Sequence, residues 1–330
     1  MTQAAHNLAF GLNNLADDLI AAGRPVEALV PLAEARPILK KLRSYHLATN
    51  EMHTGKALAR MGMSREADDA FAEAGATLQK LAEENPTGPG DLFRDFGLGL
   101  WTQGRPAEAA AVFERERAIR QRMAAGGGAG GADPDALANC ETNAAAALVA
   151  LGRPAEARAA CDRAIAFREG RFKEHPADAS FAQGLAESLL RSGHARAAAG
   201  DLAGAAADWR RAAALYAAHP PGGEQAILRA CCHGALAGLA GQPGGGVPPA
   251  EARSQADEAM AVLRRAIDGG YRDFGLIRVE PGLDPLRSRD DFRRLMGDLA
   301  FPADPFAYRV DAEYRPVPDP LITTAPAEKP

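Results

Sequence analysis

The sequence is poor in aromatic residues and in cysteine. Aromatic side chains make up 6% of the 330 residues, and the four cysteines include no CxxC pair. So few aromatic residues beside abundant alanine favour closely packed helices over a sheet-based core. The cysteine pattern excludes a disulfide scaffold. We therefore expect reduced thiols and a cytoplasmic protein.

Long apolar runs and targeting features are also missing. No stretch approaches the roughly 18 consecutive apolar residues of a membrane-spanning helix, and residues 1–12 lack the basic start and apolar centre of a signal peptide. The formal net charge of -5 argues against a general nucleic-acid binder. We expect neither a membrane span nor a nucleic-acid partner.

Catalytic and metal-binding motifs are absent as well. The sequence has no GxSxG elbow and no HExxH helix. Two DFG tripeptides, Asp95–Gly97 and Asp273–Gly275, lack the HRD loop and strand lysine of a kinase, and a GxGxxG match at 126–131 follows a helix rather than a strand. His46 and His53 have no third ligand for zinc. We expect no enzyme, no cofactor and no bound metal.

What the chain does have is a recurring turn. Gly-Arg-Pro-Ala-Glu-Ala stands at 104–109 and again at 152–157. Glycine suits a helix C-cap because it enters the left-handed region without strain, and proline suits the first turn of the next helix. Variants of the turn occur three more times. The first residue of each copy, the lead glycine, is Gly23, Gly62, Gly104, Gly152 or Gly200, and these are spaced 39, 42, 48 and 48 residues apart. Such a period is typical of stacked repeats, each read as helix, tight turn, helix.

Small and bulky residues flank each turn at fixed offsets. The position seven before the lead glycine is always glycine or alanine, and the position five after it is always alanine. The position twelve after it is alanine except at Glu116. The position nine after it holds Leu32, Phe71, Phe113, Cys161 and Trp209. This pattern resembles the tetratricopeptide repeat in its longer form of about 42 residues, as in kinesin light chains.

The resemblance implies an all-α fold, a right-handed α-solenoid of antiparallel helix pairs with a C-terminal capping helix. We expect repeats 1–3 in residues 1–123, a Gly/Ala-rich hinge-like linker at 124–133, and repeats 4–6, the sixth degenerate, in 134–268. A capping segment at 269–306 and a Pro-rich disordered tail at 307–330 follow. The predicted helices span 3–22, 25–43, 45–61, 64–84, 90–103, 106–123, 134–151, 154–175, 178–199, 202–218, 223–240 and 290–299.

The segment 258–306 carries a second resemblance. It is similar to the closing part of the repeat regions of large bacterial receptor-like serine/threonine kinases, chiefly through Leu283–Arg289 and Leu299–Pro302. The chain has neither the kinase domain nor the membrane helix of that family. The resemblance implies an alternative role, as the detached regulatory or interaction region of a serine/threonine kinase system with a kinase module as its partner.

In tetratricopeptide stacks the first helix of each pair lines a concave groove, so the resemblance places a protein or peptide ligand there. Asn14 and Asn143 occupy the offset at which related repeats hold a peptide backbone amide, and Trp101 offers an aromatic anchor. The predicted groove residues are Asn13, Asn14, Asp17, His53, Lys56, Arg94, Trp101, Asn143, Arg191 and His194. For each of them, an ordinary solvated side chain on an exposed helix is the alternative. The preferred interpretation is a non-catalytic protein–protein interaction scaffold.

Overall fold

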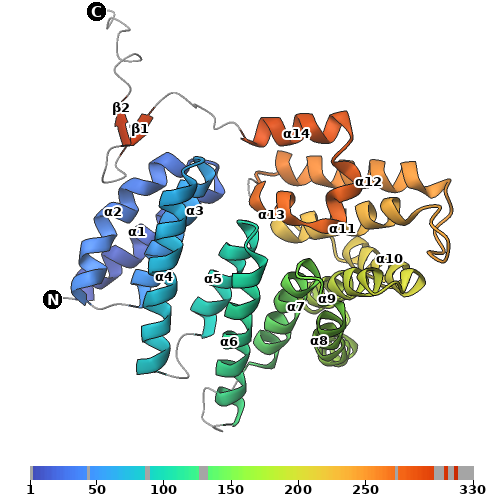
Figure 1. Ribbon diagram of the computed structural model, residues 1–330, viewed down its shortest axis with the longest axis horizontal. Helices are drawn as coiled ribbons and strands as arrows, with labels where there is room; N and C mark the ends of the chain where they lie inside the picture. The colour runs from blue at the N-terminus through green and yellow to red at the C-terminus, as the bar shows by residue number, and fades with distance from the viewer. Residues whose placement is uncertain are drawn as a thin grey trace, which may run out of the picture. The chain divides into compact units, whose positions relative to one another are not determined.

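Helices make up almost all of the described chain (Figure 1). The computed structural model describes residues 3–42, 45–85, 90–125, 133–271, 274–300, 308–310 and 316–318. The repeat helices are α1 (Gln3–Ala21), α2 (Pro25–Leu42), α3 (His46–Arg60), α4 (Ser64–Glu84), α5 (Gly90–Thr102), α6 (Pro106–Ala125), α7 (Pro134–Ala150), α8 (Pro154–Glu174), α9 (Ala179–Ala198), α10 (Leu202–Ala218), α11 (Gly223–Leu239) and α12 (Glu251–Asp268). Consecutive helices pair as predicted, α1 with α2, α3 with α4, and so on, and the predicted bounds hold to within about two residues.

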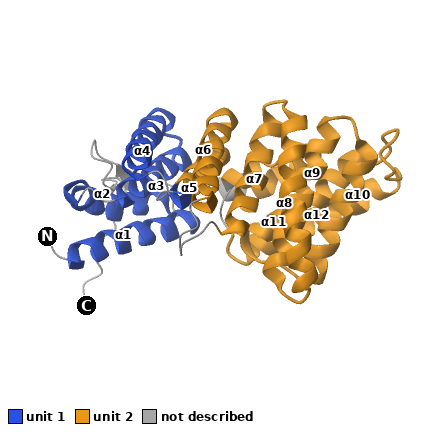
Figure 2. Cartoon of the chain, turned by 90° about the horizontal axis from the view of Figure 1, so that it is seen from below, with its two compact units in different colours: residues 1–92, 297–330 blue, residues 93–296 orange. Residues whose placement is uncertain are grey.

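The chain divides into two compact units (Figure 2). Unit 1 comprises residues 1–92 and 297–330, and unit 2 comprises residues 93–296. Each unit is an α-solenoid stack of antiparallel helix pairs. The hinge-like linker predicted at 124–133 lies mostly outside the described residues, so it stays a prediction.

The lead glycines end the first helix of each pair in the left-handed region. Their φ angles lie between 70° and 85°. At Gly152 the backbone closes in a Schellman motif, in which Gly152 N–H donates to the Val149 carbonyl at 3.0 Å and Arg153 N–H donates to the Leu148 carbonyl at 2.9 Å. The next helix begins immediately afterwards at Pro154. The predicted turn is confirmed.

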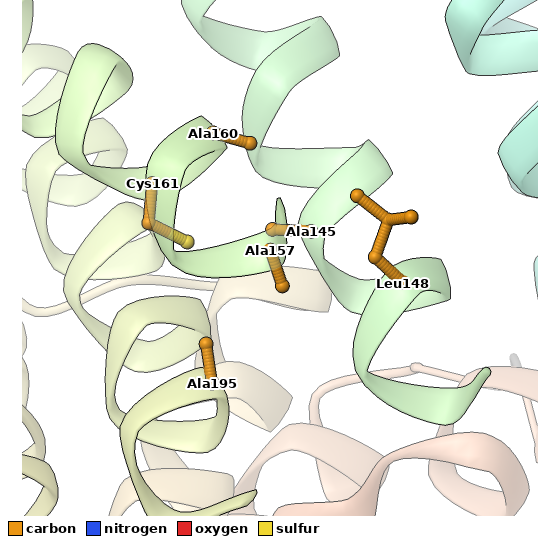
Figure 3. Close-up of a cluster of buried hydrophobic side chains, with 6 residues drawn as sticks. All are labelled: Ala145, Leu148, Ala157, Ala160, Cys161 and Ala195. Carbon is orange, nitrogen blue, oxygen red and sulfur yellow. The ribbon is translucent and has the colours of Figure 1, made fainter. Parts of the chain in front are cut away.

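The small residue before each turn faces the bulky residue after it. A Cβ built at Gly193 would lie 2.3 Å from the Trp209 ring. In the fourth pair the same offsets hold Ala145 and Cys161, which share a buried cluster with Ala157 (Figure 3). Glycine opposite an aromatic ring recurs at Gly55–Phe71 and Gly97–Phe113. The volumes at the two positions therefore complement each other and let the helices approach closely.

After α12 the chain continues through α13 (Phe274–Val279), η1 (Pro281–Leu286) and α14 (Asp290–Ala300). The 3₁₀ helix η1 lies on α11, where a Cβ at Gly234 would meet the Gly282 carbonyl oxygen at 2.2 Å. Arg264 Nη2 of α12 donates to Asp291 Oδ2 of α14 at 2.9 Å, and Phe292 is buried. The predicted capping helix is confirmed.

A short antiparallel hairpin stands within the tail that the sequence predicts to be disordered. Its strands are β1 (Tyr308–Val310) and β2 (Pro316–Pro318), and both contact α2 of unit 1. Proline is tolerated in β2 because each strand of a two-stranded sheet is an edge strand, where a missing N–H costs little. The rest of residues 307–330 lies outside the described residues.

Candidate functional site

In unit 1 the first helices α1 and α3 carry five of the predicted groove residues. Asn14 and Asp17 are exposed and Lys56 is half-buried, so these three side chains are open to a ligand. His53 is buried instead, with its Nε2 at 3.4 Å from Asp17 Oδ1. Burial, reinforced by the Lys56 ammonium, lowers the pKa of His53 to about 4. His53 is therefore a neutral packed side chain, and its place among solvent-facing groove residues is corrected.

Asn13 is likewise buried rather than exposed. Its Nδ2 donates to the His46 carbonyl at 3.1 Å, and its Oδ1 accepts from Asn50 Nδ2 at 2.9 Å. Asn50 Nδ2 also donates to the Leu32 carbonyl at 3.0 Å. These bonds tie α1 and α2 to α3, so Asn13 is committed to the fold and no longer belongs to the predicted groove.

In unit 2, α5 carries Arg94 and Trp101. Arg94 is half-buried and its Nε donates to Asp95 Oδ1 at 3.1 Å. Trp101 is only 6% exposed, so the predicted aromatic anchor is a core residue. Phe96 and Gly97 of the nearby DFG tripeptide are also packing residues, since Phe96 is buried and Gly97 faces the Phe113 ring.

On α9 both predicted groove residues are covered by other parts of unit 2. Arg191 is buried and forms a bidentate pair with Glu280, at 2.6 and 2.8 Å. His194 is buried against Trp209 in an edge-on arrangement, with ring centroids 5.3 Å apart. Desolvation, together with the Arg191 charge, lowers the pKa of His194 to about 3. Arg191 and His194 are therefore structural, which corrects the prediction.

Asn143, the predicted groove residue on α7, is half-buried and therefore stays accessible. The helix is held in place by Arg168 of α8. Arg168 donates to Ser188 Oγ at 2.7 Å, to the Gly184 carbonyl at 2.5 Å and to Thr142 Oγ1 at 3.3 Å. This cluster fixes α7 and α9 on α8. Sequence reasoning missed it because an arginine on a second helix gives no signal of its own.

The described residues offer no metal site and no membrane helix. No group of three or more histidine, cysteine, aspartate or glutamate side chains among them could hold a metal ion. In the same part of the chain no helix combines the length and hydropathy needed to cross a bilayer.

Comparison with known proteins finds a family model that matches one part of the chain. The family model described as Tetratricopeptide repeat matches residues 137–177, which include most of α7 and all of α8. This match supports a tetratricopeptide-repeat protein. The comparison with curated proteins found no significant match.

Two solved structures resemble the chain at low identity. One, from a functional characterization of Pseudomonas aeruginosa PilF, gives a TM-score of 0.43 and 15% identity over 82% of this chain and 98% of that chain. The other, the TPR2AB-domain:pHSP90 complex of yeast Sti1, gives a TM-score of 0.28 and 18% identity over 64% of this chain and 78% of that chain. Likenesses this distant carry no argument about a ligand.

Proposed function

We propose that the chain is a non-catalytic protein-interaction module whose first helices bind an extended peptide or a partner helix. The observation that carries this proposal concerns Asn14 and Asn143, whose side chains make no hydrogen bond to another described residue. The residue before each, Asn13 or Thr142, is used internally. A free side-chain amide can pair with both the carbonyl and the N–H of a peptide backbone. Because the two residues lie in different units, each is proposed as a separate contact.

The state of the cysteines gives no support to thiol chemistry. Cys140, Cys161, Cys231 and Cys232 are all buried. Burial raises the pKa of Cys161 to about 12 and raises those of the other three thiols as well. A thiol held protonated is a poor nucleophile and a poor metal ligand.

A partner captured from native cytosol with the full chain allows a direct test. Its affinity would then be measured by calorimetry for wild type, for Asn14→Ala, for Asn143→Ala and for the double variant. One lost hydrogen bond of about 0.5–1.5 kcal/mol predicts that each single change weakens binding roughly two- to tenfold. Thermal stability should hold, because neither amide bonds within the fold.

Arg253→Ala is the control, because the Arg253 side chain is 93% exposed and belongs to α12, a second helix. It should leave the affinity unchanged. If the double Asn variant binds as tightly as wild type, the first helices do not form the binding surface.

The alternative of a kinase-associated region rests on the sequence of 258–306 alone, and none of the described contacts favours it. It stays a prediction. A neighbouring reading frame that encodes a kinase domain and a membrane helix would support it, and an unrelated neighbour would count against it.

A further inference from the structure

A pocket opens on the side of unit 2 formed by the second helices α6 and α8, with α7 as its floor. Its volume is about 170 Å³. The apolar lining residues are Phe113, Ala144, Leu148, Ala159 and Ala160. An apolar cavity of about 150 Å³ holds a benzene ring, so this second-helix pocket has room for one leucine or aromatic side chain.

One end of the second-helix pocket is acidic. Glu114 of α6 and Glu156 of α8 both line it. They share a single cation, because Arg153 lies 2.7 Å from Glu156 and 4.0 Å from Glu114. Two carboxylates with one guanidinium leave this end with one negative charge in excess.

The other end is basic. Arg117 stands one turn after Glu114 on α6, and Arg163 lies two turns after Glu156 on α8. The helices α6 and α8 run in the same direction, because each is antiparallel to α7. Glu141 neutralises Arg163 through a bidentate pair at 2.6 and 2.9 Å. Arg117 is half-buried and has no ion pair or hydrogen bond with another described residue. This end therefore keeps one positive charge in excess.

We propose that the second-helix pocket binds a segment of a partner protein in which a large apolar side chain stands between a basic and an acidic one. The apolar side chain fills the pocket, the acidic group pairs with Arg117, and the basic group pairs with Glu114 and Glu156. A half-buried guanidinium without a carboxylate is stabilised by a charge-assisted hydrogen bond from outside the chain. Neither Asn14 nor Asn143 lines this pocket, so this proposal stands or fails independently of the function proposed above.

Blocked tripeptides serve as probes, because their charges can be exchanged while the apolar residue stays the same. Acetylated and amidated Lys-Leu-Glu, Lys-Leu-Lys, Glu-Leu-Glu and Lys-Ala-Glu would be titrated at millimolar concentration into the full chain. Methyl NMR of labelled alanine and leucine reports occupancy at Leu148, Ala144 and Ala160. We expect Lys-Leu-Glu to bind about three- to tenfold more tightly than each of the other three probes.

Charge reversal at the basic end makes the test specific. Arg117→Glu should exchange the preference, so that Lys-Leu-Lys becomes the best ligand of the variant. Arg253→Glu, at an exposed position of α12, should leave the wild-type order intact. Ala159→Leu places a side chain in the pocket from an exposed position and should abolish the methyl shifts without unfolding the protein.

Three results would overturn the proposal. The first is the absence of shifts at the pocket methyl groups for every probe. The second is equal affinity for the four peptides, and the third is an unchanged order in Arg117→Glu. A second copy of the chain is another possible occupant, and sedimentation velocity tests for it. If the protein self-associates and Arg117→Glu or Ala159→Leu abolishes that association, the pocket belongs to a second copy of the chain instead.

Discussion

At the scale of single residues, packing within a helix pair depends on a small residue on one helix that faces a large side chain on the other. Where the position nine after the lead glycine is an aromatic ring, the position seven before it is glycine, as in Gly193 with Trp209. Where the later residue is smaller, as in Cys161, the earlier one is alanine, as in Ala145. The two side chains together fill one space in the core, so a change of size at either position alters the packing of the other.

Gly193→Ala should therefore destabilise the protein. Its Cβ would lie 2.3 Å from the Trp209 ring, and overpacking typically costs about 1–3 kcal/mol, more than the roughly 1 kcal/mol that alanine gains in helix propensity. Gly170→Ala is the matched control, because a Cβ at Gly170 in α8 meets nothing within 4 Å. It should stabilise by up to about 1 kcal/mol. Urea unfolding measures both; equal stabilisation by the two changes would show that the ring moves aside freely.

At the scale of elements, the attachment of the C-terminal segment depends on one buried ion pair. Glu280, next to η1, has no exposed side-chain surface, and Arg191 on α9 has 6%. Burial alone would lower the pKa of Arg191, but the Glu280 carboxylate raises it above its ordinary value. Each partner depends on the other, because a buried charge without its counter-ion is costly.

Glu280→Ala should cost about 3–5 kcal/mol in the free energy of unfolding, since it leaves Arg191 buried and unpaired. Arg191→Met combined with Glu280→Met should recover most of that loss, because an apolar pair of similar size has no charge to desolvate. Urea unfolding gives the energies, and hydrogen exchange of residues 274–286 shows whether η1 has loosened. A double variant as unstable as Glu280→Ala would show that the loss comes from packing rather than from the unpaired charge.

Local signals account for what could be predicted at this scale. Turns such as Gly152–Pro154 and the apolar periodicity fix helix ends and pairing within a few residues of sequence, so nearly every helix was predictable. Burial of the groove residues was not, because Asn13 is covered by α3 and Arg191 by a carboxylate 89 positions away. A repeat offset tells which face of its own helix a residue occupies, but not which later segment lies on that face.

At the scale of the whole molecule, buried neutral histidines link stability to pH. The pKa of His53 is lowered to about 4 and that of His194 to about 3, in both cases mainly by burial. The unfolded chain takes up these protons near pH 6.5, whereas the folded chain does not until the pH is far lower. Stability due to both groups is therefore present above pH 6.5 and is lost as the pH falls below it. Burial raises the pKa of Glu51 and Glu116, which acts in the opposite sense.

His194→Phe isolates one of these contributions. Phenylalanine keeps the ring against Trp209 but takes up no proton, so the variant should lose less stability in acid than wild type. Between pH 6.5 and 4.5 the difference should reach about 2–3 kcal/mol, at roughly 1.4 kcal/mol per pH unit for one proton. Urea unfolding of both proteins at pH 7 and 4.5 measures it, and because Glu51 and Glu116 titrate alike in the two proteins, their contribution cancels. Parallel pH profiles would mean that His194 is protonated in the folded protein, and the buried imidazolium would then stand beside the Arg191 cation, whose charge opposes its protonation.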